Sequence, residues 1–334
     1  MNKNAVQKIV LLSLAAVLLC IYILQVSIGG KSKTQTLTLK EDVTSITIYT
    51  GSDSANAISV SKDGDKYTVS KADGSESYDA MPTAAESLFD SIREMHILGN
   101  AARLSSSNEE RFGLDANSRI SVQAKAGDKI LRSLQVGKNS SSGSQSYLTI
   151  DDSSQILISS SSLHTIFSVT MDSLRSKDIY SIPEETITQI SVDSDDGSFT
   201  LSKSSQPKSD ENTEDGQGMS INESQWTLTS SNNGEIIPQL DQDAANEWAV
   251  YISTLNASSW VDEKSFNQNV IQKGKLSFMS NGITYSVQFF EIDGDENQML
   301  CSSNVTPYRF FLSKYTAQKF LRKLSDISLG GEND

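Results

Sequence analysis

The chain is poor in the residue types that carry out most enzyme chemistry. It contains two cysteines and two histidines among 334 residues. Cys20 lies inside a long apolar run, where it acts as a small hydrophobe, so Cys301 is left without a disulfide partner. His96 and His164 have no second His, Cys or carboxylate at metal-ligand spacing, so the sequence offers no support for zinc.

Motifs for phosphate binding and nucleophilic catalysis are missing as well. There is no Gly-rich phosphate loop and no Gly-x-Ser-x-Gly turn. Serine is abundant, but a catalytic triad would have to recruit His96 or His164 without any local feature to mark it. We expect both histidines to be structural or exposed, and we expect no catalytic residue and no cofactor.

Acidic clusters do not fit metal-binding patterns. Residues 193–197 resemble the start of a calcium loop, but the twelfth position is Ser204, where such a loop needs Glu. The Asp-Gly-Asp-Glu run at 293–296 is typical of a hairpin turn. We therefore expect no metal at either cluster.

Carboxylates and tryptophans leave a carbohydrate-active protein as an alternative. A glycosidase needs two carboxyls about 5–9.5 Å apart, and nothing distinguishes such a pair among the 42 acidic residues. Trp226, Trp248 and Trp260 could line a sugar platform. The first two fall at strand and helix core positions, so we expect them in cores.

Basic residues are scarce after the N-terminal region. All 42 acidic residues but only 23 of the 28 basic ones lie beyond Lys40, a net charge of about −19. Such a surface repels nucleic acid and anionic lipid headgroups, so we expect neither as a partner.

One segment has no charge at all. Residues 9–28 include thirteen Leu, Ile or Val and span roughly 30 Å as a helix, the thickness of a bilayer core. We expect an uncleaved single-pass anchor, with residues 1–8 inside the cytoplasm and the remainder exported. A cleaved signal peptide is the alternative, because Ser27 and Gly29 form a small-x-small pattern.

The rest of the chain presents one order of elements twice: three short strands, an amphipathic helix, a run of strands and a second helix. The apolar stripe of the first helix recurs about 160 positions later. Its members Ala85, Leu88, Ile92 and Met95 correspond to Ala245, Trp248, Ile252 and Leu255.

Helix boundaries follow from capping patterns. Thr83 and Glu86 fit a capping box at the start of the first helix, and Gly99 fits its C-terminal stop. The other helices are expected at about 161–176, 242–255 and 314–325.

Alternating apolar and polar residues predict short strands, and tight turns between them predict antiparallel sheets. With one helix covering one sheet face in each half, the sequence predicts an α+β fold of two tandem, duplicated modules. Two registers relate the halves, since 58–71 can also be aligned with 190–203. The strands are expected at 45–49, 57–60, 66–69, 120–122, 134–136, 147–150, 156–159, 189–192, 198–201, 225–228, 276–278, 285–290, 299–301 and 310–313.

The predicted organisation has one boundary between the halves, near Pro183. Residues 204–224 are polar and of low complexity, which predicts a disordered loop; a segment that folds on a partner is the alternative. The expected parts are a juxtamembrane linker at 29–44, a first repeat at 45–182, a second repeat at 183–328 and a tail at 329–334.

Several segments between about 45 and 185 resemble one known family. They are the strand Lys66–Val69, the helix through Leu88, the tetrapeptide Phe112–Asp115, and the segments Leu134–Gly137 and Leu174–Asp178. On these residues the chain resembles the bacterial membrane-anchored domain-of-unknown-function family 4340. The resemblance implies one N-terminal span, an exported tandem domain and no established catalytic residues. It also implies a setting similar to accessory components of gliding-type ABC transport systems.

The tetrapeptide Phe112, Gly113, Leu114 and Asp115 is the most distinctive of these segments. We interpret it as a structural turn, because Gly113 permits a backbone angle that other residues avoid. Phe112 and Leu114 would hold the turn against the sheet. The second half lacks this tetrapeptide and has residues 261–270 in its place.

Together these features predict a non-catalytic, membrane-anchored extracytoplasmic accessory or scaffold protein. Its partners would be proteins of a membrane complex, such as the subunits of an ABC transporter. The alternative is a binding module for envelope glycan or peptide, and a hydrolase is the least favoured hypothesis.

Overall fold

The structure, a computed structural model, describes residues 17–19, 34–51, 53–207, 222–231 and 239–329. The expected anchor at 9–28 lies outside the described residues, except for three helical residues, Val17–Leu19. Within the described part of the chain, no helix combines the length and the apolar character needed to cross a bilayer.

The chain divides into two compact units, Met1–Ser176 (unit 1) and Lys177–Asp334 (unit 2). The boundary lies a few residues before the expected one at 182/183. The reason is β11 (Asp178–Ser181), which pairs with β15 (Thr254–Asn256) and therefore belongs to unit 2.

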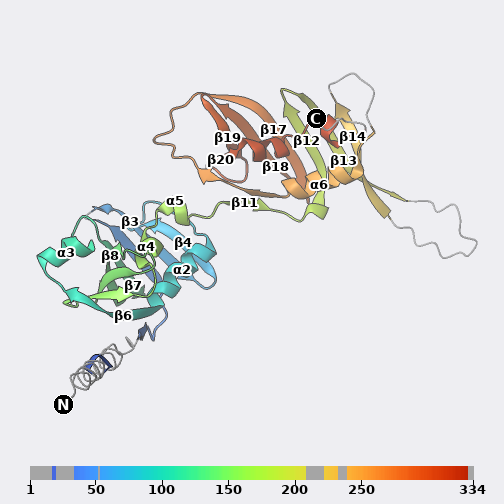
Figure 1. The fold of residues 1–334 in the computed structure, drawn as a ribbon. Helices are drawn as coiled ribbons and strands as arrows, with labels where there is room; N and C mark the ends of the chain where they lie inside the picture. Colours follow the sequence, from blue (N-terminus) through green and yellow to red (C-terminus); the bar gives the residue numbers. More distant parts are fainter. Residues whose placement is uncertain (1–16, 20–33, 52, 208–221, 232–238, 330–334) are drawn as a thin grey trace, which may run out of the picture. The chain divides into compact units, whose positions relative to one another are not determined.

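Unit 1 contains a ten-stranded antiparallel sheet in the order β1-β6-β10-β9-β8-β7-β2-β3-β4-β5 (Figure 1). Its strands are β1 (Gln35–Thr38), β2 (Ser45–Thr50), β3 (Asp53–Asp63), β4 (Lys66–Lys71), β5 (Ser77–Asp79), β6 (Glu94–Arg103), β7 (Ile120–Ala126), β8 (Lys129–Asn139), β9 (Ser146–Ile150) and β10 (Gln155–Ser159). Its helices are α2 (Pro82–Arg93), α3 (Ser106–Phe112), α4 (Leu163–Phe167) and α5 (Met171–Leu174).

The two faces of this sheet carry different clusters. Side chains alternate between faces along a strand, so Leu157 of β10 faces the main core under α2 and α4. Its neighbour Ile156 instead packs with Phe112, the last residue of α3, and with Leu114 just after this helix. Helix α3 therefore covers the face opposite to α2.

Unit 2 contains an eight-stranded antiparallel sheet in the order β14-β13-β12-β17-β18-β19-β20-β16, besides the β11–β15 pair. Its strands are β12 (Ile187–Ser194), β13 (Gly197–Pro207), β14 (Asn222–Ser231), β16 (Ser259–Trp260), β17 (Val270–Ser280), β18 (Ile283–Ile292), β19 (Asp295–Ser303) and β20 (Phe310–Ser313). Its helices are α6 (Gln242–Ile252) and α7 (Lys314–Phe320), with 3-10 turns η1 (Glu184–Thr186) and η2 (Leu324–Ile327).

The expected α+β class with antiparallel sheets is confirmed, and the two sheets share one strand order. The series β6-β10-β9-β8-β7-β2-β3-β4 corresponds to β16-β20-β19-β18-β17-β12-β13-β14. Because β2 pairs with β7 and β12 pairs with β17, Ile46 corresponds to Ile190. The alternative alignment of 58–71 with 190–203 is therefore excluded.

Each unit begins with a strand that the sequence did not predict: β1 lies in the expected linker, and β11 lies at the end of the expected first repeat. Leu37 of β1 pairs with Met95 of β6, and Tyr180 of β11 pairs with Leu255 of β15. Met95 and Leu255 are equivalent, so β1 and β11 are equivalent too. The expected linker at 29–44 thus contains the first strand of unit 1.

The helical stripes are buried as expected, but their ends differ. Helix α2 begins at Pro82 after Met81 and has no side-chain cap, so the capping box from Thr83 is wrong. The backbone becomes extended at Glu94, where pairing with β1 starts, and Gly99 lies within β6 rather than at a helix end. Met95 and Leu255 are also buried, but they lie on strands β6 and β15 and not on the helices. The buried helical positions are Ala85, Leu88, Phe89 and Ile92 in α2, and Ala245, Trp248, Ala249 and Ile252 in α6.

Other expected elements are shorter than predicted. The helix expected at 161–176 is two short helices, α4 and α5, and the final helix ends at Phe320. Strands β13 and β14 extend into the loop expected at 204–224, and its central part, 208–221, lies outside the described residues.

The corner under the end of the first helix is filled by a cation in unit 1. Arg132 of β8 is buried, and its guanidinium donates hydrogen bonds to the carbonyl oxygens of Ile92 and Leu37. Burial lowers the pKa of Arg132. This side chain therefore ties the last turn of α2 to the first strand.

Aromatic rings fill the same corner in unit 2. Tyr285 occupies the position equivalent to Arg132 and stacks on Phe278, with ring centroids 5.1 Å apart. Tyr180 packs edge-on against Phe278 at 5.6 Å. The Tyr180 hydroxyl is buried and has no hydrogen-bond partner among the described residues.

We expect Tyr180→Phe to stabilise unit 2 by about 1 kcal/mol, because it removes a buried hydroxyl without a partner. Chemical denaturation followed by tryptophan fluorescence measures this, since Trp226, Trp248 and Trp260 all lie in unit 2. The control is Tyr285→Phe, whose half-buried side chain should change stability little. A loss of stability in Tyr180→Phe would contradict the expectation.

Candidate functional site

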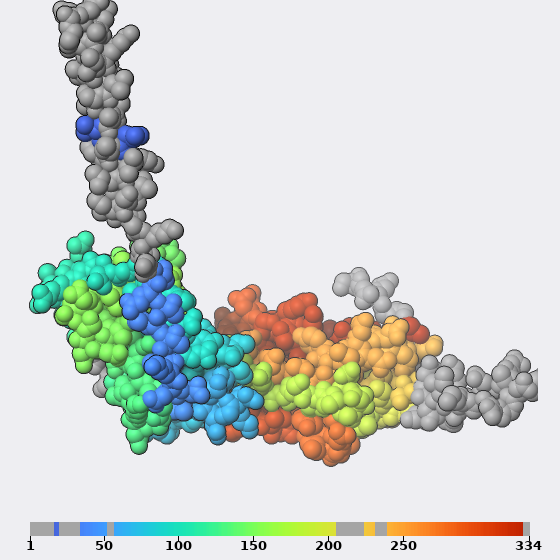
Figure 2. Space-filling view, turned by 90° about the horizontal axis from the view of Figure 1, so that it is seen from below, coloured from blue at the N-terminus to red at the C-terminus, as the bar shows by residue number. Residues whose placement is uncertain are grey.

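A groove in unit 1 is the strongest candidate for a binding site. It has a volume of about 450 Å³, in the range of small-ligand sites. It lies between α2, the β3–β4 turn and the segment before β2. The part of the chain that contains these segments is coloured blue to cyan in Figure 2. Its lining residues are Asp42, Val43, Thr44, Lys62, Gly64, Tyr67, Glu86, Phe89, Asp90 and Arg93.

Two buried aromatic rings line the groove. Tyr67 from β4 and Phe89 from α2 have ring centroids 5.6 Å apart. The Lys62 ammonium lies 5.4 Å from the centroid of the Tyr67 ring, a cation–π contact. The rings form the apolar part of the groove lining, and Lys62 adds a positive charge beside them.

The charged groups of the groove differ in whether they are already paired. Arg93 and Asp90 form an ion pair on α2 with a distance of 2.9 Å. Asp42 and Glu86 have no cationic partner among the described residues, and within that part of the chain the Lys62 ammonium contacts no carboxylate. The groove therefore presents charges of both signs that a ligand can neutralise.

The equivalent position in unit 2 is bridged by its own side chains. Lys203 lies 5.4 Å from the Trp226 ring, as Lys62 does from Tyr67. However, the Trp226 indole donates to Asn246 Oδ1 at 3.0 Å, and Asn246 is the equivalent of Glu86.

Gln242 adds a second link between helix and sheet. Its side-chain oxygen accepts from the Trp226 N–H at 2.8 Å, and its side-chain nitrogen donates to the Trp226 carbonyl at 2.9 Å. Pro82 stands at the equivalent position in unit 1 and cannot make these bonds.

The two histidines take part in local backbone and side-chain contacts. His96 lies on β6, not on the helix, and its Nδ1 is 3.0 Å from Thr36 Oγ1. His164 lies in the first turn of α4, with its Nδ1 2.9 Å from the Gly137 carbonyl oxygen. Cys301 is buried in the unit 2 core, and burial raises the pKa of its thiol.

The tetrapeptide at 112–115 ends α3. Gly113 has a φ of 68°, and the Leu114 N–H donates to the Glu109 carbonyl at 2.7 Å while the Gly113 N–H donates to Glu110. These two bonds define a Schellman motif, which needs a left-handed residue at Gly113. Hydrogen bonds from Ser118 and from the Asn117 backbone lower the pKa of Asp115.

The turn packs closely against the sheet. Phe112 lies 4.6 Å from the Tyr147 ring, measured between centroids. A Cβ on Gly137 of β8 would collide with the Phe112 carbonyl oxygen. Two segments that carry the family resemblance, 112–115 and 134–137, are therefore in direct contact.

In unit 2, where residues 261–270 replace this turn, Phe266 packs against Phe311 with ring centroids 6.0 Å apart. The Arg309 guanidinium lies 5.0 Å from the Phe266 ring and pairs with Glu263.

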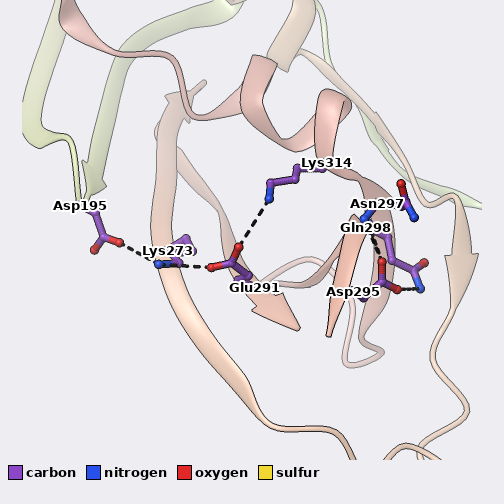
Figure 3. Close-up of polar contacts among 7 residues, drawn as sticks. All are labelled: Asp195, Lys273, Glu291, Asp295, Asn297, Gln298 and Lys314. Atoms are coloured by element: carbon purple, nitrogen blue, oxygen red, sulfur yellow. Dashed lines mark hydrogen bonds and ion pairs between the residues drawn. The ribbon is translucent and has the colours of Figure 1, made fainter. Parts of the chain in front are cut away.

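Acidic side chains in and near the turns of unit 2 form ion pairs with lysines and hydrogen bonds with amides. Lys273 lies 3.4 Å from Asp195 and 3.3 Å from Glu291, and Lys314 lies 3.5 Å from Glu291 (Figure 3). Asp196 pairs with Lys323 at 3.1 Å.

Asp295 turns the β18–β19 hairpin, as expected, and accepts hydrogen bonds from the Asn297 N–H and from the Gln298 amide (Figure 3). Within the described residues, no group of His, Cys, Asp and Glu could hold a metal ion.

The lysine network shifts the pKa values of its members. Hydrogen bonding to Lys273 lowers the pKa of Glu291, and hydrogen bonding to Glu291 and Asp195 raises the pKa of Lys273. Glu291 thus favours the folded state above its ordinary pKa and loses this contribution as the pH falls through its lowered pKa. Lys273 contributes below its ordinary pKa and loses the contribution as the pH rises through its raised value.

The sequence did not predict the groove. Phe89 lies one turn after Ala85 and belongs to the buried stripe of α2. This spacing is the one sequence feature that could have pointed to Phe89 as a residue of the groove. Trp226 and Trp248 lie in the unit 2 core, as expected, and Trp260 is half-buried.

The described fold is therefore a pair of α+β units, one of which carries a charged groove. The profile of the domain of unknown function DUF4340 matches residues 78–269, more than half of the chain, and the chain belongs to this family. The match covers both sides of the boundary between the units, and the 112–115 turn lies within it. No curated protein and no solved structure matches the chain.

We expect Gly137→Ala to destabilise unit 1 by at least about 2 kcal/mol, because its Cβ has no room beside the Phe112 carbonyl. Circular dichroism reports both units, whereas tryptophan fluorescence reports unit 2. The variant should therefore shift the first signal and not the second. Gly127→Ala is the control: its Cβ meets open space, and its φ of 57° costs about 1 kcal/mol. Equal losses in both variants would refute the steric explanation.

We expect Lys273→Gln to raise the pKa of Glu291 toward its ordinary value, because it removes the hydrogen bond that favours the carboxylate. A ¹³C NMR titration of the glutamate carboxyls measures the shift. Lys275→Gln, an exposed lysine on the same strand, should leave Glu291 unchanged. An unchanged pKa in Lys273→Gln would show that this contact does not persist in solution.

Proposed function

We propose that the protein is a non-catalytic accessory or scaffold protein that acts through protein partners in an ABC-type transport complex. The observation that carries the proposal is that a histidine and the Cys301 thiol, residue types that often catalyse reactions, make structural contacts inside the fold. His164 contacts the Gly137 carbonyl, and the thiol of Cys301 is buried with a raised pKa. Membership of the DUF4340 family and the repeated sheet order add support.

In this proposal, residues 9–28 anchor the chain in the bacterial cytoplasmic membrane, with the N-terminus inside and both units outside. The uncharged apolar run supports the anchor. The concentration of acidic residues beyond Lys40 suits a soluble exported part.

A module that binds an envelope peptide or glycan is the second candidate function. The groove of unit 1 favours it, because this groove combines buried aromatic rings with unpaired charges. The two candidates differ in what should remain bound to the chain after isolation from cells.

Crosslinking in intact cells, followed by detergent extraction and mass spectrometry, tests the main proposal. The tagged full-length chain should recover permease and ATPase subunits of a transporter. A matched chain with residues 9–28 replaced by an unrelated apolar span controls for membrane attachment alone, and it should recover fewer of these subunits. Recovery of peptide or glycan without transporter subunits would reject the accessory role and favour the second candidate.

A further inference from the structure

We infer that the groove of unit 1 binds a peptide segment carrying both a basic side chain and an acidic group. The basic side chain is held by Asp42 and Glu86, and the acidic group pairs with Lys62. This inference rests on the second candidate function and specifies the ligand class and the residues that recognise it.

The unpaired charges decide the ligand class. Asp42 and Glu86 line the groove without a cationic partner in the described part of the chain, whereas Arg93 is already paired with Asp90. A lysine or arginine side chain of a ligand supplies the missing positive charge. Electrostatic complementarity of this kind governs specificity more than total affinity.

The aromatic rings suit the remainder of such a side chain. Lysine and arginine carry apolar stems that pack on hydrophobic surface while the charged end reaches a carboxylate. Tyr67 and Phe89 form the apolar lining beside the charges, where the stem of such a side chain would pack.

Lys62 adds the second half of the recognition. It lies over the Tyr67 ring and contacts no carboxylate among the described residues, so an acidic group of the ligand can pair with it. A neutral glycan would leave Lys62, Asp42 and Glu86 all unpaired. A peptide with charges of both signs can satisfy all three.

The carboxylate at this position of the groove is a feature of unit 1, since unit 2 has Asn246 there. The Lys–aromatic contact is present in both, at Lys62–Tyr67 and Lys203–Trp226. In unit 2, Asn246 bonds to the Trp226 indole and bridges helix and sheet. In unit 1 the equivalent residue is Glu86, which leaves its carboxylate available to a ligand.

The test is affinity selection on the purified full-length chain in detergent. The probe is a library of end-capped pentapeptides whose central three positions are Lys, Glu, Gln or Ala, and bound peptides are identified by mass spectrometry. Enriched peptides should contain both Lys and Glu, and their binding should weaken as ionic strength rises.

Variants connect the selection to the groove. Glu86→Gln should weaken binding of enriched peptides roughly tenfold. Lys62→Gln should remove the preference for Glu in the peptide and keep the preference for Lys. The controls are Glu110→Gln, which removes an exposed carboxylate on α3, and Lys203→Gln, which removes the equivalent lysine in unit 2; both should bind normally.

A charge reversal keeps the test independent of simple loss of folding. Glu86→Lys should turn the preference away from Lys-containing peptides while circular dichroism stays unchanged. The inference is overturned if the unmodified chain enriches no peptide, or if Glu86→Gln and Glu110→Gln bind alike. Binding of chitotetraose that survives Glu86→Gln would overturn it too, in favour of a glycan site.

The crosslinking experiment remains a separate measurement. Recovery of transporter subunits by Glu86→Gln, with peptide binding lost, would support the groove as a site distinct from the contact with the transporter. A failed peptide selection rejects this inference alone, and a failed recovery of subunits rejects the accessory role alone.

Discussion

Both units depend on the burial of one helical stripe against one face of an antiparallel sheet. Leu88 in α2 and Trp248 in α6 are almost completely removed from solvent at equivalent positions. Apolar burial is the main favourable contribution to folding, and it fixes the distance between helix and sheet. Because the chain passes directly from helix to strand at Glu94 and at Thr254, the stripe also determines where the next strand pairs.

The two units keep the same backbone arrangement even where their side chains differ in chemistry. The corner beneath the first helix holds the buried Arg132 in one unit and stacked rings, including Tyr285, in the other. A guanidinium satisfies backbone carbonyls, whereas rings fill the same space by contact alone. The same backbone arrangement is therefore compatible with two different sets of side chains. Individual side chains can then take on a role in one unit alone.

The groove follows from that freedom. A tryptophan bonded to Asn246 bridges helix and sheet in unit 2, whereas the smaller Tyr67 and the charged Glu86 line an open groove in unit 1. Some surface charges elsewhere are engaged locally, as in the network of Lys273 with Asp195 and Glu291. The groove differs from the general acidity of the surface because charges of both signs line one hollow beside aromatic rings.

Periodicities of a few residues were enough to predict the α+β class, most strands and the repeated helical stripe, because these features depend only on neighbouring positions in the chain. Tertiary structure decided where the helices ended: pairing with β1 drew Glu94 and Met95 into a strand despite their helical spacing. It also created the groove, whose walls come from residues 42–44, 62–67 and 86–93. Segments so far apart meet only once the sheet and helix have packed, so no local pattern could mark the site.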